Sequence, residues 1–539
     1  MLPRRDFGSG TLERPAGKNV NIELKSEPAT EPGSPVTDPG LVGSELNKLA
    51  RHSSHYIAGL AASTVVGFVS FPIFTRAFSV AEYGIIDLAQ KLLLLLVAAA
   101  KMGIQNATLR FYDERKFAKD PGAAPRYYST MFFGALSTSA GVALVCLAVQ
   151  GFAPSSWISG PLAGLIQYIS VLVVLRALGS ILGGFLRIEE RTKAFNVTTV
   201  GTRAATVAVI CVPLPLTGRT AQTYFGGIIL VEAAMVAILT TLLLRRGMLV
   251  PARCDLALFR TGIAFGMPLV VYESAFTMLA SADRFLVQHF LGADALGFYS
   301  VAYGLAQHVN DLLVTPLNLA LMPIYMRLWT AEGRERTIQF LSVALDLFLL
   351  AGVGILAVAA ASAHDFVVFL ASSKYAGADR LIPLLLSGLL IYTMHIFLAA
   401  GLLIYERTLQ MAGILLASAV VNIGLNWVLL QRIGLMGGAV AVLLSYAVCI
   451  LALGYASHRL LPLRINVKSL GKYLSAAAVA YLVASQVRIQ SPIVSLAARS
   501  TVALSLYIGI MLFADLRLRR AAGRLCRWLA VAIRAGEAS

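Results

Sequence analysis

The chain has 539 residues, of which 58% are hydrophobic and 14% are charged, and its mean hydropathy is +0.74. Soluble domains carry about 25% charged residues, so this composition excludes an ordinary soluble protein and predicts an all-α, polytopic membrane protein. A net charge of +17 would suggest nucleic acid in a soluble protein, but its distribution here points elsewhere. The five cysteines are scattered, so the sequence predicts no disulfide framework, no metal site and no cofactor.

The two ends of the chain differ from its apolar middle. Residues 1–50 are rich in Pro, Gly, Glu and Ser and contain no apolar run, so we predict a disordered cytoplasmic tail rather than a cleaved signal peptide. Residues 515–539 alternate Arg clusters with Leu, Trp and Val at helical spacing. This pattern predicts an amphipathic cytoplasmic helix lying on an anionic inner leaflet.

Fourteen apolar segments lie between these ends, and each is long enough to cross a bilayer. They are placed near 56–78, 84–109, 127–150, 161–186, 194–216, 222–244, 259–282, 295–320, 337–360, 381–404, 410–431, 435–457, 470–487 and 492–514. With the N-terminus inside, the inner segments carry 33 Lys and Arg and the outer loops carry 6. This asymmetry predicts fourteen transmembrane helices with both termini in the cytoplasm.

The first twelve predicted spans form two copies of a six-span repeat. The segment SVAEYGIIDLAQ (79–90) parallels GADALGFYSVAYGLAQ (292–307), LRIEERT (186–192) parallels LLIYERT (402–408), and the Gly pair 226–227 parallels 437–438. Six spans return the chain to its starting side, so the copies share one orientation. We therefore predict two pseudo-symmetric lobes (51–250 and 251–460) around a central cavity, plus two extra helices in 461–514.

The second span carries polar residues on one face of an apolar helix. At about 100° per residue, Asp87, Lys91, Lys101 and Gln105 share an arc of about 80°. Charges at this depth usually face a protein interior or a wet cavity, so we predict that this stripe lines the central cavity. The alternative is an Asp87–Lys91 pair at i,i+4 together with helix packing.

The predicted spans of the two lobes differ in charge. Five bases lie in the first lobe: Arg76, Lys91, Lys101, Arg176 and Arg203. The second lobe's spans hold Glu273, Asp311 and Asp346 but no Lys or Arg except Arg260, which is counted with the preceding inner loop. The repeat places Gln307, Asp311 and Asn318 opposite the stripe of the second span. Either these groups line a cavity for an anion, or acids of one lobe neutralise bases of the other across the interface.

Four segments carry a family resemblance: FPIFTRAFSVAEYGIIDLAQ (71–90), GIQNATLRFYDE (103–114), ADRFLVQHFLGADALGFYSVAYGLA (282–306) and LALMPIY (319–325). They resemble the polysaccharide-biosynthesis flippases of the Wzx type, in the multidrug/oligosaccharidyl-lipid/polysaccharide exporter superfamily. The resemblance implies a non-enzymatic flippase that moves undecaprenyl-pyrophosphate-linked oligosaccharide across the inner membrane by alternating access. Its implied partners are that lipid, membrane lipids, a polysaccharide polymerase and a chain-length regulator, and no nucleic acid.

The charge pattern agrees with an anionic substrate. Lys91, Lys101 and Arg176 are the expected pyrophosphate ligands, because a cation in a low-dielectric cavity binds an anion strongly. Further lining residues are expected to be Arg76, Arg203, Gln105, Gln307 and Asn318.

Coupling and gating are expected to involve acids. Glu273 and Asp311 are the candidates for proton coupling, because the interior of the predicted spans in their lobe holds no Lys or Arg that competes for them, and Asp87 is a candidate gating residue. The alternative is that Asp311 pairs with Lys101 or Lys91 across the interface and only closes a gate.

Two other functions are compatible with parts of the pattern, and a third, enzymatic one is not. A lipid II flippase shares the topology and the basic cavity, and a multidrug or organic-cation antiporter shares the fold and would use Glu273. A membrane polymerase or glycosyltransferase needs a catalytic segment, and the longest predicted outer loop (361–380) is too short for one. No phosphate-binding loop of the G-x-x-x-x-G-K-[ST] form is present, so the sequence predicts no ATP-driven transport.

Overall fold

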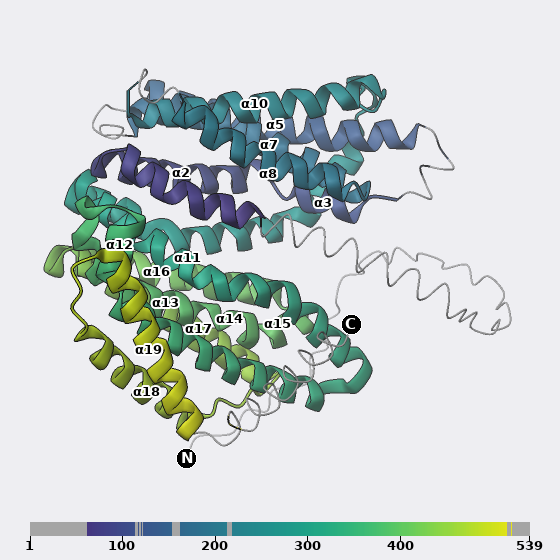
Figure 1. Ribbon diagram of the computed structural model, residues 1–539. Helices are drawn as coiled ribbons and strands as arrows, with labels where there is room; N and C mark the ends of the chain where they lie inside the picture. Colours follow the sequence, from purple (N-terminus) through teal and green to yellow (C-terminus); the bar gives the residue numbers. More distant parts are fainter. Residues whose placement is uncertain are drawn as a thin grey trace, which may run out of the picture. The chain divides into compact units, whose positions relative to one another are not determined.

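The computed structural model describes residues 62–113, 117, 120, 122–152, 162–212, 218–514 and 519. Within these ranges every regular element is an α-helix or a short 3₁₀-helix (Figure 1). The all-α prediction is therefore confirmed for the described residues. The predicted tail of residues 1–50 lies outside them, and so does the predicted C-terminal helix of residues 515–539 apart from Arg519.

The first half of the chain forms helices close to its predicted spans. They are Ala62–Ala77, α2 (Val80–Lys101), α3 (Ile104–Arg110), α5 (Ala123–Phe152), η1 (Ala163–Leu165), α7 (Ile166–Ile188), α8 (Thr192–Cys211) and α10 (Ala221–Arg245). Ser79 is the N-cap of α2, since its side chain accepts a hydrogen bond from the backbone N–H of Glu82. The Glu82 carboxylate also accepts from the N–H of Ala221 at 2.6 Å, which ties the start of α2 to the start of α10.

The second half begins with η2 (Pro251–Arg253) and the 106-residue α11 (Leu256–Ala361). Gly292 and Gly333 interrupt α11, with φ of 84° and 80° and extended ψ, a conformation that is essentially confined to glycine. The remaining elements are α12 (Ala363–Leu370), η3 (Ser373–Leu381), α13 (Ile382–Thr393), α14 (His395–Leu398), α15 (Ala400–Ile404), α16 (Thr408–Ile433), α17 (Leu435–His458), α18 (Val467–Ser485) and α19 (Pro492–Ala514).

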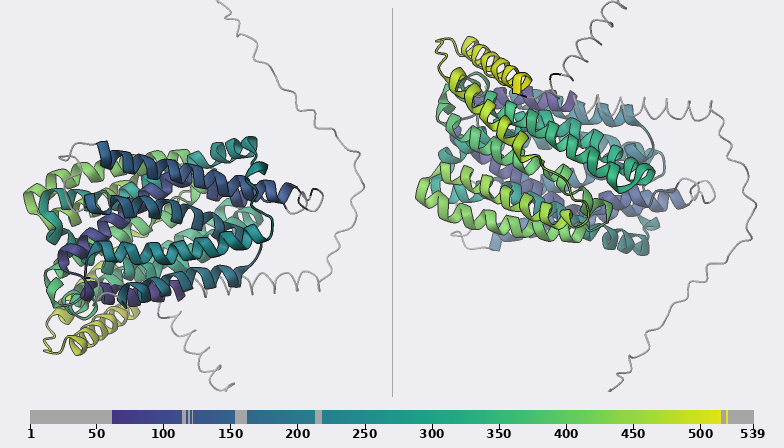
Figure 2. Two further views of the ribbon diagram at one scale, coloured as in Figure 1. Left: turned by 90° about the horizontal axis from the view of Figure 1, so that it is seen from above. Right: turned by 90° about the horizontal axis from the view of Figure 1, so that it is seen from below.

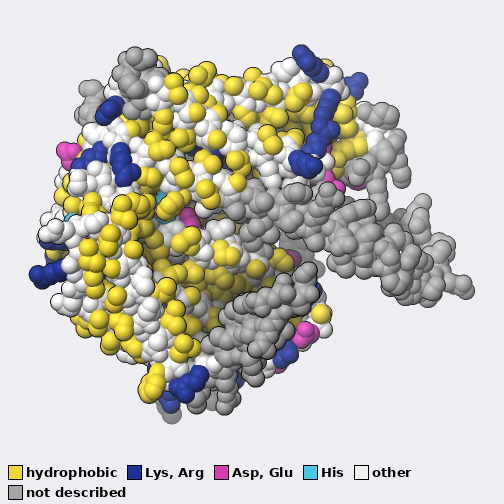
Figure 3. Space-filling view, in the orientation of Figure 1, with side chains coloured by type: hydrophobic (Ala, Val, Ile, Leu, Met, Phe, Trp, Pro, Cys, Tyr) yellow, Lys and Arg dark blue, Asp and Glu magenta, His cyan; other side chains and the backbone are white. Residues whose placement is uncertain are grey.

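The described helices are suited to a bilayer. Ten of them are long and apolar enough to cross a membrane when α11 is counted once. Large apolar side chains point outward, such as Val197 in α8 and Leu451 in α17, each 72% exposed. Figure 3 shows a largely hydrophobic face with Lys and Arg gathered mostly near the helix ends. The chain is therefore a multi-pass membrane protein, while the count of fourteen spans stays a prediction.

Buried apolar side chains form one large core in the second half and two smaller cores in the first half, one along α2 and the other between α3, α5, α7 and α10. The large core includes Phe71 and Leu88, so the Ala62–Ala77 helix and α2 pack directly on α11. The helices α18 and α19 (yellow in Figure 2) lie side by side at the edge of the bundle, where Tyr473 and Tyr507 cluster with Val353 of α11.

One turn recurs in both halves at the offset of the predicted repeat. Glu190 and Glu406, which occupy the same place in LRIEERT and LLIYERT, both adopt left-handed conformations, with φ of 54° and 56°. The next residue in each copy donates its N–H to the carbonyl five residues earlier, Arg191 to Leu186 at 2.9 Å and Arg407 to Leu402 at 2.8 Å. This is a Schellman termination with glutamate at the position that usually holds glycine.

This turn gives a stability prediction. A left-handed conformation costs a side-chain-bearing residue about 1–2 kcal/mol, and a β-branched side chain is tolerated least. We expect Glu406→Val to lower the free energy of unfolding by about 1–2 kcal/mol, and Glu406→Gly to leave it unchanged or raise it. Thermal unfolding of the purified protein measures this. Glu335→Val, at an exposed helical position, is the control; equal effects of Val and Gly at position 406 would contradict the prediction.

Candidate functional site

The stripe predicted on the second span is divided by a break in the chain. The helix α2 ends at Lys101, and α3 starts at Ile104. Met102 and Gly103 between them have positive φ, 43° and 74°. The prediction of one continuous helix through Gln105 is therefore wrong. Gln105 lies on α3, where its Oε1 accepts a hydrogen bond from the hydroxyl of Ser180 at 2.6 Å.

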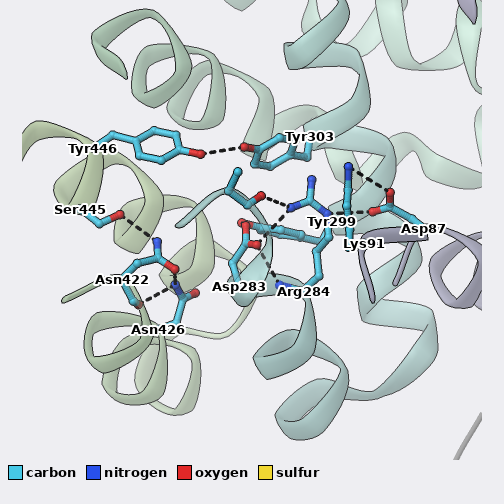
Figure 4. A network of polar contacts seen from close by, with 11 residues as sticks. Asp87, Lys91, Asp283, Arg284, Tyr299, Tyr303, Asn422, Asn426, Ser445 and Tyr446 are labelled. Atoms are coloured by element: carbon cyan, nitrogen blue, oxygen red, sulfur yellow. Dashed lines mark hydrogen bonds and ion pairs between the residues drawn. The ribbon is translucent and has the colours of Figure 1, made fainter. Parts of the chain in front are cut away.

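A buried charge network joins α2 to α11. Arg284, whose exposed fraction is 1%, donates through Nε to Asp87 Oδ2 at 2.9 Å and through Nη1 to Asp283 Oδ1 at 3.1 Å. Lys91 lies 3.8 Å from the other oxygen of Asp87. Figure 4 shows these four side chains converging from the two elements. We call Asp87, Lys91, Asp283 and Arg284 the central charge network.

The network is neutral in total and almost closed. Two carboxylates face two cations, and burial of such groups is tolerable only when each is paired. The hydroxyl of Tyr299 donates to the second oxygen of Asp283, and the ring of Tyr303 lies 4.0 Å from the guanidinium carbon of Arg284. Lys91 is the most exposed of the four side chains, at 29%. It is therefore the cation most available to a ligand.

Asp283 and Arg284 were not among the predicted site residues. The predicted span ended at residue 282, and the second lobe was expected to hold no Lys or Arg within its spans. In the structure α11 continues helically to Gly292, so both residues lie inside the helix. Their signal was present, because they belong to one of the segments that carry the family resemblance.

Lys101 and Glu273 form a second ion pair between α2 and α11. Lys101 Nζ lies 2.9 Å from Glu273 Oε1, and the side chains are 11% and 32% exposed. The prediction that Glu273 is free of a basic partner is therefore wrong, because the base comes from the other half of the chain. Among the described residues Asp311 pairs with neither lysine, and it accepts from the amide of Gln307 at 2.7 Å. The alternative of an Asp311–lysine gate is thus not found in this structure.

Arg176 and Arg203 line a cavity of about 490 Å³ within the first half. Arg176 lies 3.1 Å from Glu232 and donates to Gln90 Oε1 at 3.1 Å. Arg203 donates to the backbone carbonyl of Ser63 at 3.0 Å. Neither Lys91 nor Lys101 belongs to this lining. Of the three predicted pyrophosphate ligands, only Arg176 therefore lines this cavity.

A second cavity, of about 280 Å³, lies within the second half and includes the predicted residues Gln307 and Asn318. Tyr303 lines it, and its hydroxyl lies 3.0 Å from that of Tyr446. Tyr303 also contacts Arg284, so this cavity adjoins the central charge network. We call the two spaces the first-half cavity and the second-half cavity.

A buried amide cluster lies between α16 and α17 and was not predicted. Asn422 donates through Nδ2 to the hydroxyl of Ser445 at 2.8 Å, and Asn426 donates to Asn422 Oδ1 at 3.2 Å. All three side chains are fully buried. Figure 4 places the cluster on the helices that also supply Tyr446. Isolated Asn and Ser residues in apolar spans gave no spacing signal that would have identified it.

Two backbone crossings connect the halves at opposite ends of α2. At the first, a Cβ on Gly84 would lie 2.6 Å from the backbone nitrogen of Gly297, a residue 213 positions later, as in the predicted repeat. At the second, a Cβ on Gly266 would lie 2.5 Å from the Cα of Gly103. Glycine is therefore required on both sides of each crossing. We call these the Gly84 crossing and the Gly103 crossing.

Arg76 lies near the Gly84 crossing rather than in a cavity. It is exposed and donates to the carbonyl of Phe369 in α12. Lys374 of η3 makes a similar contact with the carbonyl of Phe78. These two contacts join the halves at the same end as the Gly84 crossing.

Within the described residues no group of three His, Cys, Asp or Glu side chains is arranged to hold a metal ion. The four described cysteines are free.

The chain was compared with known families and structures. The family described as "Polysaccharide biosynthesis protein" matches residues 73–379, more than half of the chain. No curated protein matches.

Among solved structures, the chain is similar to the lipid II flippase MurJ in an inward closed conformation, with a TM-score of 0.55 and 12% identity over 86% of this chain and 99% of that one. It is also similar to an inward-facing multidrug resistance MATE family transporter of the MOP superfamily, with a TM-score of 0.53 and 13% identity over 78% and 94%. The chain is also similar to a crystal structure of a MATE point mutant, with a TM-score of 0.51 and 13% identity over 78% of this chain and 96% of that one. These identities establish the fold alone, which is that of MurJ and the MATE transporters.

Proposed function

The chain belongs to the family of polysaccharide biosynthesis proteins, and on this premise we propose that it is a flippase for polyprenyl-pyrophosphate-linked oligosaccharide. The substrate is carried from the inner to the outer leaflet of the inner membrane for surface polysaccharide assembly. The polyprenyl chain stays in lipid, and the pyrophosphate crosses between the two halves. A polysaccharide polymerase and a chain-length regulator would act on the product.

The observation that carries this proposal is the set of cations held at the contact between the halves. Lys91, Lys101 and Arg284 each face a carboxylate, and every pair lies between α2 and α11 or within one of them. A pyrophosphate carries the oxygens and the charge that would compete with Asp87 and Glu273 for these cations. Its binding would thus loosen the ion pairs that join the halves, which links substrate binding to opening.

Alternating access supplies a role for the two crossings. With both termini inside, as the 33-to-6 distribution of Lys and Arg favours, α2 runs from the outer to the inner side. The Gly84 crossing then closes the outer end and the Gly103 crossing the inner end. The charge network and the Lys101–Glu273 pair lie between them in sequence, so the substrate's head group would meet these cations whichever end opens.

Asp311 is our candidate for coupling to a proton gradient. It is half-buried in α11 and hydrogen-bonded to Gln307 rather than paired with a base. Glu273 is a weaker candidate, because Lys101 compensates its charge. The same pairing argues against an organic-cation antiporter that would use Glu273 as its cation site.

A reconstituted system tests the proposed function. Purified protein in liposomes is supplied with a fluorescent undecaprenyl-pyrophosphate-linked saccharide, and a membrane-impermeant quencher reports the fraction reaching the opposite leaflet. We expect rapid exchange with the wild type and at least a tenfold slower rate for the Lys91→Ala, Lys101→Ala double variant. Lys472→Ala, which removes a lysine of α18 outside the site, should exchange normally.

Further arms of the experiment define the substrate and the coupling. Fluorescent lipid II in place of the saccharide lipid tests the alternative substrate directly. An imposed proton gradient should accelerate the wild type but not Asp311→Asn. Unchanged exchange in the lysine double variant would overturn the assignment of the pyrophosphate site.

A further inference from the structure

The second-half cavity has a chemistry different from that of the first-half cavity. Its walls come from two stretches of α11 together with α13, α14 and α17. Its lining residues include no Asp, Glu, Lys or Arg, whereas the first-half cavity contains Arg176, Arg203 and Glu232. A charged ligand would find no counter-charge on this lining, so its chemistry favours a neutral ligand.

Aromatic rings form one part of the lining. The ring of Tyr392 stacks on Phe276 with centroids 5.8 Å apart and on His395 at 4.5 Å, with interplanar angles of 30° in both cases. Tyr446 packs against the same ring at 4.9 Å. Because each ring is held by its neighbours, the surface is rigid and costs little entropy to bind against. Phe276 is 40% exposed and so offers part of its surface to a ligand.

Amide groups form the other part and retain hydrogen-bonding capacity. Gln307 uses its Nε2 on Asp311, which leaves Oε1 as an acceptor. Asn310 accepts from Thr393 through Oδ1 at 3.1 Å, which leaves its NH₂ as a donor. Asn318 adds a complete amide at an exposed position. Acceptors and donors thus stand beside aromatic surfaces in one uncharged space.

This combination matches the surface of a sugar ring. A pyranose presents apolar C–H groups on its faces and hydroxyl groups around its edge, and the hydroxyls need both donors and acceptors when they leave water. C–H groups pack favourably on the electron-rich faces of aromatic rings. A space of about 280 Å³ is at the lower limit of small-molecule cavities, so it suits one sugar rather than a whole oligosaccharide.

We propose that the second-half cavity binds a sugar unit of the lipid-linked oligosaccharide, an inference that rests on the proposed function. Tyr303 supplies the connection, because it lines the cavity and also packs on Arg284 of the central charge network. A pyrophosphate held at that network would place its attached sugar next to this cavity. The pyrophosphate would then provide most of the affinity, and the cavity would select among saccharides.

The test compares two lipids that differ only in the sugar. Wild type and variants in nanodiscs, free of glycoside detergents, are titrated with undecaprenyl pyrophosphate and with undecaprenyl-pyrophosphate-linked N-acetylglucosamine. The main variant is Asn318→Ala with Phe276→Ala, since both positions are exposed. Because the double variant removes one hydrogen bond and one aromatic contact, we expect about a tenfold to thirtyfold loss of affinity for the sugar-bearing lipid only.

The outcomes separate the two proposals. Phe152→Ala, which removes a 91% exposed ring from α5, is the control and should bind both lipids as the wild type does. Unchanged binding of the sugar-bearing lipid by the double variant, or an equal loss for both lipids, would overturn the sugar site while leaving the flippase proposal standing. If wild type binds neither lipid, the flippase proposal fails and the sugar site fails with it.

Discussion

Arg284→Met is expected to abolish transport and to lower the free energy of unfolding by about 3–5 kcal/mol, because it leaves two carboxylates without their main partner in a buried site. Arg284 is 1% exposed and contacts Asp87, Asp283 and the ring of Tyr303. Lys91, which remains near Asp87, lies 3.8 Å away and cannot replace the hydrogen bonds of the guanidinium. Thermal unfolding of purified protein and the liposome assay measure the two effects.

The chain offers a matched control for this variant. Arg459 also packs on a tyrosine, at 5.1 Å from the ring of Tyr455, but it is exposed at the end of α17. Arg459→Met should unfold and transport like the wild type, because an exposed contact of this kind contributes about 1 kcal/mol or less. If Arg284→Met does not accumulate in the membrane, Asp87→Asn provides a milder test. This variant leaves Arg284 paired with Asp283, so we expect it to fold. Normal transport by both Arg284→Met and Asp87→Asn would show that the network is only structural.

Gly297→Ala is expected to stop transport while the protein still folds. The added methyl group would overlap the carbonyl oxygen of Val80 at the Gly84 crossing, and neither backbone can move away without separating the halves at this end. We expect the variant to be held open there. Ser300→Cys, one turn away and 3% exposed, reports this opening, and it should react with a water-soluble maleimide faster in Gly297→Ala than in wild type.

Gly509→Ala is the matched control, because this helical glycine of α19 has no neighbouring atom within 4 Å of an added Cβ. It should transport normally and gain slightly in stability through better helix propensity. All measurements use a background without the five native cysteines. Normal transport by Gly297→Ala would contradict the role assigned to the Gly84 crossing.

The sequence predicted those features of the site that depend on residues close together in the chain. Asp87 and Lys91 are four residues apart on one helix, so their pairing follows from helical geometry alone. The apolar runs likewise predicted where helices form. In contrast, Asp283 and Arg284 lower the local hydropathy, so the apolar run ended before them although the helix continues. The partner of Arg284 on α2, Asp87, lies 197 residues away, where no local pattern can reveal it.

The sequence also could not predict which side chains of the two halves pair with each other. Lys101 was predicted as a pyrophosphate ligand, with pairing to Asp311 as the alternative, and the structure pairs it with Glu273 instead. The relative position of α2 and α11 decides which acid of α11 it meets. The break at Met102–Gly103 has the same origin. It occurs where Gly266 of the other half approaches, and an apolar run gives no sign of that approach.

The two glycine crossings bear on how the membrane retains its electrical potential. Moving one elementary charge through 100 mV releases about 2.3 kcal/mol, so any protein that opens to both sides at once would dissipate the gradient that drives other transporters. At each crossing backbone meets backbone with no side chain between them, and Gly84 and Gly103 lie on either side of the charged residues of α2. In the proposed flippase, two such seals in series would let one end open for a large sugar lipid while the other insulates, so a bulky cargo could pass without a current of small ions.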